Sequence, residues 1–207
     1  MTSVLDESLQ HVTLLDRRGE WLLGTQRNDT SQFGEDGLIE AVLKRIGETN
    51  RWCLEVGAAD GLFYSNTKRL RDAGWYAVLI EADPLSAGKC RQFESPRVQV
   101  HQEKVKPESL DNILAGGGAP IRLDLGIIDV DGQDYWIWDG LKSFRPRVML
   151  VEFMYVNDSF SDPEFVPELN GPGQAGLDAI VELGRRKGYT PLVATFCNAL
   201  FVDTSCL

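Results

Sequence analysis

The chain has 207 residues, of which 43% are hydrophobic and 25% are charged. This composition is typical of a globular protein, and the length fits one α/β domain with a short extension. A formal net charge of −10 opposes the binding of a polyanion and argues against a nucleic-acid partner. The N-terminal residues lack the basic and apolar blocks of a signal peptide, and no apolar stretch approaches the roughly 20 residues of a membrane span. We therefore expect a cytoplasmic protein without a membrane partner.

Residues 1–30 mix apolar and charged positions in a weakly helical pattern, and we expect them to form an N-terminal helical cap on a main domain of residues 31–207. The main domain opens with a clear amphipathic helix, whose apolar positions run from Leu38 to Ile46. Ser31 is predicted to cap this helix, and Gly47 is predicted to end it.

From residue 52 onward, short apolar runs alternate with helical stretches. Buried strands are predicted at 52–56, 76–80, 97–100, 125–130, 147–153, 191–195 and 199–202. Helices are predicted at 66–73, 133–141 and 177–187. We interpret Tyr135, Trp136 and Trp138 as the face of a helix packed on the sheet, with a substrate platform as the alternative.

This alternation predicts a Rossmann-like α/β fold, with a mostly parallel seven-stranded sheet and helices on both faces. The last two strands are separated only by a short turn around Cys197, which has no room for a crossover helix. They are therefore predicted to pair as an antiparallel hairpin. An antiparallel last strand is the arrangement of class I methyltransferases and not of nicotinamide-binding Rossmann domains.

A glycine-containing loop follows the first of the seven strands, in the segment from Glu55 to Gly61. In open α/β sheets, ligands bind beyond the carboxyl ends of the strands, near this position. The spacing is Gly-x-x-x-Gly, whereas a dinucleotide phosphate needs the tighter Gly-x-Gly-x-x-Gly. S-adenosylmethionine carries no phosphate, so the looser loop suits it. We place cofactor contacts at Glu55, Gly57, Ala58, Asp60 and Gly61.

A carboxylate follows the second of these strands, where Glu81 lies 24 residues after Gly57. A carboxylate at this position accepts hydrogen bonds from ribose hydroxyls, so Glu81 is predicted to bind the ribose, with Asp83 beside it. The alternative is that the two glycines only form a tight turn and that Glu81 caps a helix.

With these motifs in place, the chain resembles the FkbM-like family of S-adenosylmethionine-dependent methyltransferases. The matching segments lie in the expected order at 31–36, 55–61, 65–67, 80–84, 128–132, 151–153 and 198–202. The resemblance implies that Gln32, Ser65 and Asn66 lie near the methionine end of the cofactor. It also implies O-methylation of a sugar, a glycan or a small hydroxylated metabolite. The sequence departs from the pattern at Ala59, where many methyltransferases have glycine, and at Asp131, where FkbM-like chains often have Glu.

The candidates for chemistry are Asp134 and three carboxylates at the ends of the strands predicted at 125–130 and 147–153: Asp129, Asp131 and Glu152. A hydroxyl acceptor must lose its proton, either to a base such as Asp131 or under the influence of a metal. The three carboxylates would suit Mg²⁺ or Mn²⁺. In the alternative interpretation, Asp129 positions the methionine end of the cofactor and Asp131 caps the next helix.

The segment 157–173 is rich in Pro, Gly and acidic residues, and it follows the strand at 147–153. Long loops at this edge of a sheet often select the substrate, and its acidity disfavours an anionic acceptor. A surface insertion without function is the competing interpretation. Two other functions stay open: an NAD-dependent Rossmann oxidoreductase, for which no Tyr-x-x-x-Lys group is found, and a catalytically inactive S-adenosylmethionine-binding module.

Overall fold

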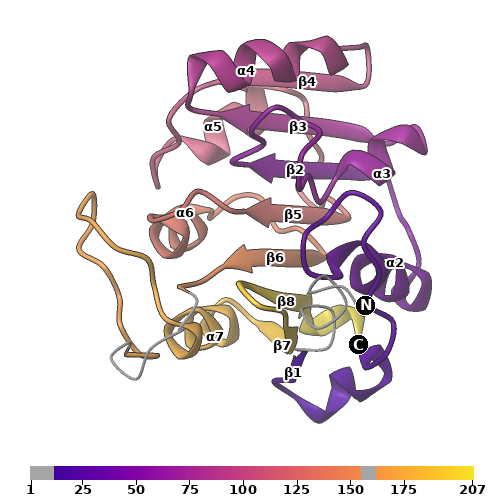
Figure 1. Cartoon of the computed structure of the whole chain (residues 1–207), viewed down its shortest axis with the longest axis vertical. Coiled ribbons are helices and arrows are strands. Elements are labelled where there is room, and N and C mark those ends of the chain that lie inside the picture. The colour runs from indigo at the N-terminus through magenta and orange to yellow at the C-terminus, as the bar shows by residue number, and fades with distance from the viewer. Residues whose placement is uncertain (1–11, 155–161) are drawn as a thin grey trace, which may run out of the picture.

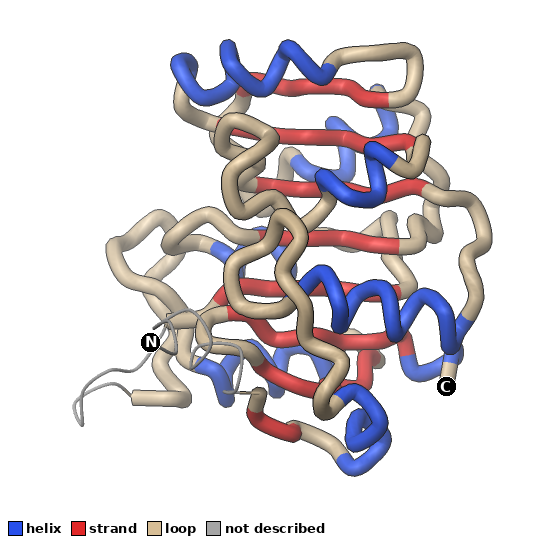
Figure 2. The backbone as a smooth tube through the Cα atoms, turned by 45° about the vertical axis from the view of Figure 1, so that its right-hand side comes forward, coloured by secondary structure: helices blue, strands red, loops and turns tan. Residues whose placement is uncertain are grey.

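The computed structural model describes residues 12–154 and 162–207. These residues form one eight-stranded sheet with helices on both faces (Figures 1 and 2). The strand order across the sheet is β1-β7-β8-β6-β5-β2-β3-β4. The strands are β1 (Thr13–Leu14), β2 (Trp52–Val56), β3 (Tyr76–Glu81), β4 (Val98–Gln102), β5 (Leu125–Ile128), β6 (Val148–Glu152), β7 (Tyr189–Ala194) and β8 (Asn198–Asp203).

The helices lie between the strands in sequence, as expected for an α/β fold. They are α2 (Glu35–Ile46), α3 (Lys68–Asp72), α4 (Pro84–Cys90), α5 (Leu110–Gly116), α6 (Asp134–Gly140) and α7 (Leu177–Arg186). Three short 3₁₀ turns complete the list: η1 (Arg17–Leu22), η2 (Arg91–Phe93) and η3 (Thr204–Cys206). None of the helices within the described ranges is long and apolar enough to cross a bilayer.

The predicted antiparallel hairpin is confirmed. The neighbouring strands β4-β3-β2-β5-β6 pair in parallel, whereas β8 pairs antiparallel with both β6 and β7. Six strands therefore share one direction and β8 opposes them, which gives the class I methyltransferase arrangement. We call the side of the sheet at which the parallel strands end, on the left in Figure 1, the upper edge, and the side at which they begin the lower edge.

The eighth strand, β1, was not predicted. Thr13 and Leu14 extend the sheet by pairing antiparallel with Ala194 and Val193 of β7. Both residues are exposed, and a two-residue strand shows no periodic pattern in the sequence. The main domain thus receives an edge strand from the segment that was expected to be helical.

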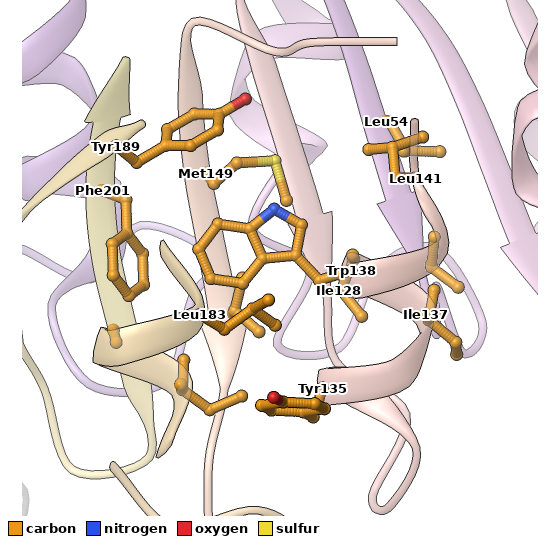
Figure 3. Close-up of a cluster of buried hydrophobic side chains, with 14 of the residues drawn as sticks. Leu54, Ile128, Tyr135, Ile137, Trp138, Leu141, Met149, Leu183, Tyr189 and Phe201 are labelled. Carbon is orange, nitrogen blue, oxygen red and sulfur yellow. The ribbon is translucent and has the colours of Figure 1, made fainter. Parts of the chain in front are cut away.

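Two apolar cores hold the helices against the sheet. One core joins α2 and α4 to one face of the sheet, and the other joins α5, α6 and α7 to the opposite face. Trp138 of α6 lies at the centre of the second core, with its ring centroid 4.8 Å from Phe201 and 5.7 Å from Tyr189 (Figure 3). The interpretation of Trp138 as a residue packed on the sheet is confirmed.

The start of α2 differs in detail from the prediction. The helix begins at Glu35, and Gly34 (φ 97°) occupies the N-cap position instead of Ser31. Ser31 still satisfies the first turn, because its Oγ accepts the Asp36 N–H at 3.0 Å. In return, the Asp36 carboxylate accepts the N–H groups of Asp29, Thr30 and Ser31 at 2.7–2.9 Å. This exchange fixes the turn that carries Gln32. The predicted end of the helix at Gly47 is confirmed.

A buried ion pair joins β5 and β6 at the lower edge. Arg147 donates to Asp124 at 2.8 Å, and the Asp124 side chain is 0% exposed. Asp124 also accepts hydrogen bonds from Thr49, Asn50 and Arg51. These bonds from residues 49–51 tie the turn before β2 to the start of β5, and Arg147 ties the start of β6 to the same carboxylate. The pair therefore anchors the lower edge.

Candidate active site

A cavity of about 830 Å³ lies at the upper edge of the sheet, beyond the ends of β2, β3, β5 and β6. Its position is the one expected for a ligand of an open α/β sheet. Ten of the residues predicted from the sequence line it: Gln32, Glu55, Gly57, Ala58, Ser65, Asn66, Glu81, Asp129, Asp131 and Glu152. Asp60, Gly61 and Asp83 are close in sequence but do not line it.

Gly57 is required by its neighbour across the sheet. Its φ is 85°, and a Cβ atom there would lie 1.6 Å from the carbonyl oxygen of Asp129. Gly57 was predicted as a cofactor contact. The structure gives another reason for a glycine here, since the backbone at the end of β5 occupies the space of a side chain. The Gly57 and Ala58 N–H groups donate to the Ile80 carbonyl, which fixes the turn at the end of β3 as well.

The rest of the loop is also in the left-handed region at two positions. Gly61 has φ 74°, and a Cβ atom there would lie 2.9 Å from both Cys90 Sγ and the Phe93 ring. Ala59 has φ 47°, a conformation that favours glycine. The same conformation accounts for the glycine that many methyltransferases have at this position. Asp60 accepts the N–H groups of Leu62 and Phe63, both at 2.9 Å, and so shapes the loop.

Glu81 ends β3 and joins the two loops at the cofactor end of the cavity. One carboxylate oxygen accepts the Ala59 N–H at 2.8 Å, and the other accepts the Asp83 N–H at 2.7 Å. Each oxygen keeps a further lone pair, so the carboxylate can still accept two hydroxyl groups. Asp83 accepts the Ser86 N–H at 2.7 Å and caps α4.

Glu55 lies in the cavity wall and organises it. Its carboxylate accepts hydrogen bonds from Ser65 Oγ, Asn66 N and Thr67 Oγ1, and the residue is only 3% exposed. Arg71 donates to Ser65 Oγ and Thr67 Oγ1. Burial raises the pKa of Glu55, and the hydroxyl donors oppose that rise. The network holds Asn66 in the wall.

Asn66 carries an unsatisfied polar atom. The residue is 5% exposed and lines the cavity, and its Oδ1 is buried without a hydrogen-bond partner in the described part of the chain. Buried polar atoms are usually paired, so an unpaired one in a cavity wall indicates a missing ligand donor. An ammonium or hydroxyl group of a ligand would fit.

Asp129 and Glu152 form a carboxyl pair at the ends of β5 and β6. Burial is the largest cause that raises the pKa of each group, and the neighbouring carboxylates raise both further. Two close carboxylates cannot both ionise easily, so the pair retains a proton. Asp131 (φ 54°) donates its N–H to Glu152 Oε2 at 3.0 Å and thereby lies beside the pair.

Asp134 holds the turn before α6. Its carboxylate accepts the Val130 N–H at 2.8 Å and the Gly132 N–H at 3.0 Å. Burial raises the pKa of Asp134 to about 6. The alternative role of Asp131 as a helix cap is wrong, because Gln133 occupies the N-cap position of α6 and no side chain caps the helix. Asp131 lines the cavity instead.

The proposed metal set finds no support in the geometry. Within residues 12–154 and 162–207, no group of three or more His, Cys, Asp or Glu side chains is placed to hold a metal ion. Asp129 and Glu152 are engaged with each other, and Asp134 is engaged with backbone N–H groups. We assign no step to a metal.

The outer wall of the cavity, defined as residues 170–173, comes from the segment that precedes α7, which extends beyond the left-hand ends of the strands in Figure 1. Gln133 holds this wall, because its amide donates to the Gly171 carbonyl at 2.9 Å and accepts the Asn170 N–H at 2.8 Å. Trp136 Nε1 donates to the Pro167 carbonyl at 2.8 Å. Trp136 therefore anchors the segment in addition to packing on the core.

The cavity has further lining residues that the sequence did not single out, among them Lys104, Lys106, Gln133 and Cys197. Burial raises the pKa of the Cys197 thiol, so it is uncharged. The two lysines follow β4, and their position just after a strand was the one available signal. Nothing in the sequence marks Gln133, since its role depends on a segment more than thirty residues away.

Comparison with solved structures supports the topology described above. The chain is 20% identical to an O-methyltransferase from Bacillus cereus in complex with SAH, with a TM-score of 0.51 over 98% of this chain and 91% of that one. It is 19% identical to the O-methyltransferase TomG from Streptomyces achromogenes in complex with SAM, with a TM-score of 0.52 over 98% of this chain and 90% of that one. It is 14% identical to a precorrin-6y C5,15-methyltransferase from Geobacter metallireducens, with a TM-score of 0.52 over 86% of this chain and 92% of that one.

These similarities show a common fold, the Rossmann-like methyltransferase fold. No family model and no curated protein matches the sequence.

Proposed function

We propose that this chain is an S-adenosylmethionine-dependent O-methyltransferase whose acceptor is a sugar, a glycan or another small hydroxylated metabolite. The observation that carries the proposal is the wall formed by Gly57, Glu81 and Asn66. It offers a glycine turn, a carboxylate with free lone pairs and an unpaired buried acceptor at the ends of β2 and β3. The resemblance to FkbM-like methyltransferases supplies the acceptor class.

The residues present fit the cofactor. Glu81 would hold the ribose hydroxyls, and Asn66 Oδ1 would accept from the ammonium group of the methionine end. When bound, S-adenosylmethionine supplies a methyl group whose bond to sulfur breaks as its bond to the acceptor oxygen forms. The antiparallel β8 separates this fold from nicotinamide-binding Rossmann domains, and no observation favours the oxidoreductase alternative.

The chain's own contribution is position and proton transfer. Asp131 lines the cavity next to the Asp129–Glu152 pair, and we assign to its carboxylate the proton that leaves the acceptor hydroxyl. Orientation supplies the rest, since effective molarities of about 10⁵–10⁸ M are reached when two reactants are well aligned.

Calorimetry with S-adenosylhomocysteine and with NAD tests the proposal. We expect binding of the first and not of the second. Glu81→Ala should abolish binding of S-adenosylhomocysteine, whereas Asp131→Ala should preserve it and remove turnover. Glu103→Ala is the matched control, because Glu103 also lines the cavity but has no assigned role. Tighter binding of NAD, or full binding by Glu81→Ala, would contradict the proposal.

A further inference from the structure

The cations that line the cavity lie at one end of it. Its only lysines within the described residues, Lys104 and Lys106, follow β4, on the side where Glu81 and Glu103 supply carboxylates. At the opposite side, beyond β5 and β6, the charged side chains in the wall are Asp129, Asp131 and Glu152. The first end therefore carries both signs of charge, whereas the second carries only acidic groups.

No cation compensates the acidic end. In the described part of the chain, neither Asp131 nor the Asp129–Glu152 pair takes part in an ion pair, whereas Asp29, Asp124 and Asp203 each have an arginine partner. The segment 155–161, which lies nearby in sequence, contains no Lys or Arg. The charge at this end is thus available to a ligand.

The remaining wall at this end is neutral. Residues 170–173 and Gln32 contribute amide, glycine and proline surfaces, and Gln133 fixes the first of these by its two hydrogen bonds with Asn170 and Gly171. Under the proposed function, the cofactor occupies the side of Gly57 and Glu81, so the acceptor must lie between Asp131, Glu152 and the outer wall.

We propose that this end of the cavity selects a hydroxylated acceptor that is neutral or positively charged near its reacting hydroxyl, and that Asp131 and the Asp129–Glu152 pair make the selection. The inference rests on the proposed function. An acceptor with a phosphate or carboxylate next to the reacting hydroxyl would meet the Asp131 carboxylate and the acidic pair with no cation beside them, so it is rejected by repulsion and by the loss of its hydration.

Two cofactor analogues test the inference without knowledge of the acceptor. Sinefungin resembles S-adenosylhomocysteine but carries an amine where the transferred methyl group lies, so it places a positive charge at the acidic end. We expect calorimetry near pH 7.5 to show sinefungin binding at least tenfold more tightly. Asp131→Asn should reduce this ratio severalfold, and so should Asp129→Asn combined with Glu152→Gln, which removes the charge that the pair shares.

Glu103→Gln is the control for charge removal, because Glu103 lines the same cavity at the lysine end and should leave the ratio unchanged. Retained binding of S-adenosylhomocysteine shows that each variant is folded. Equal affinities for the two analogues, or a ratio that survives both in Asp131→Asn and in the double variant Asp129→Asn with Glu152→Gln, would overturn the inference while leaving the proposed function intact. Failure of both analogues to bind would instead contradict the proposed function.

A turnover screen supplies the second arm. S-adenosylhomocysteine release should be stimulated by neutral and amine-bearing polyols and sugars, and not by their phosphorylated or carboxylated counterparts. A preferred acceptor from the anionic set would overturn the inference.

Discussion

Buried carboxyl groups lie at both ends of β5 and β6, but only the one at the lower edge has a cationic partner. At the lower edge, Asp124 and Arg147 precede the two strands, and the carboxylate is fully buried with an arginine and several N–H donors around it. At the upper edge, Asp129 and Glu152 lie at the ends of the same two strands, and their carboxyl groups have no cationic partner. Hydrogen bonds and Arg147 keep the pKa of Asp124 low against its burial, whereas burial raises the pKa values of the upper pair.

The difference separates structure from function along one pair of strands. A buried charge is tolerated only when it is paired and hydrogen-bonded, as it is for Asp124. The upper carboxyls lack that compensation, and strongly perturbed carboxyls in a cavity indicate a functional site. Stability should therefore depend on the lower edge, and binding should depend on the upper edge.

The largest expected effect is the loss of the lower pair. Asp124→Ala should lower the free energy of unfolding by about 3–5 kcal/mol, because Arg147 stays buried without its partner. Urea denaturation measures this. The matched variant at the upper end, Glu152→Gln, should change the free energy of unfolding by about 1 kcal/mol or less, because an amide of similar size replaces a carboxyl group whose ionisation burial already opposes. Similar losses in both variants would break the comparison.

The next effect concerns the contact between the glycine loop and the upper end of β5. Gly57→Ala should destabilise the protein by about 2–4 kcal/mol and abolish cofactor binding, because its Cβ atom overlaps the Asp129 carbonyl. Gly24→Ala is the control, since Gly24 has a similar φ of 87° but nothing within 4 Å of the added atom. There we expect a loss of only about 1 kcal/mol. Equal losses would show that backbone conformation, and not the contact with β5, requires Gly57.

The two ends should also respond oppositely to pH. The lowered pKa of Asp124 means that its contribution to stability is present above its unfolded pKa of about 3.9 and is lost as the pH falls. The raised pKa values of Asp129 and Glu152 mean that their contribution is complete below about pH 4 and is lost as the pH rises through the folded values.

Unfolding free energies from pH 3 to 9 measure both trends. Asp129→Asn combined with Glu152→Gln should flatten the loss on the neutral and alkaline side and leave the acid side unchanged. If the double variant altered the acid side alone, the assignment of the two trends would be reversed.

Sequence patterns predicted the elements better than the contacts between them. The run at 52–56 was predicted as a strand with the bounds that β2 has, because a continuous apolar run bounded by polar residues is typical of a buried parallel strand. The short turn at Cys197 predicted the antiparallel hairpin for a steric reason. Each of these signals is local.

The remainder depended on tertiary contacts. The hydrogen bonds from Gln133 and Trp136 to the outer wall join residues more than thirty positions apart. Gly57 was predicted to contact the cofactor, but the atom that excludes a side chain there is the Asp129 carbonyl oxygen at the end of β5. Asp131 was predicted either to take part in the chemistry or to cap the next helix, and the choice between them depends on the path of the turn that Asp134 holds and not on residue type.

The smallest effect tests the one departure of the glycine loop from other methyltransferases. Ala59 has φ 47°, where an L-residue is strained by about 1 kcal/mol, and its N–H donates to Glu81 at 2.8 Å. Ala59→Gly relieves that strain but increases the entropy of the unfolded chain by a similar amount, so the free energy of unfolding should change by less than about 1 kcal/mol. The Ala59 N–H bond to Glu81 does not involve the side chain, so cofactor affinity should be retained within about threefold, measured by calorimetry. A large loss of affinity would show that the Ala59 methyl group itself contacts the ligand, and the loop at the upper edge would then owe its function to a side chain as well as to its backbone.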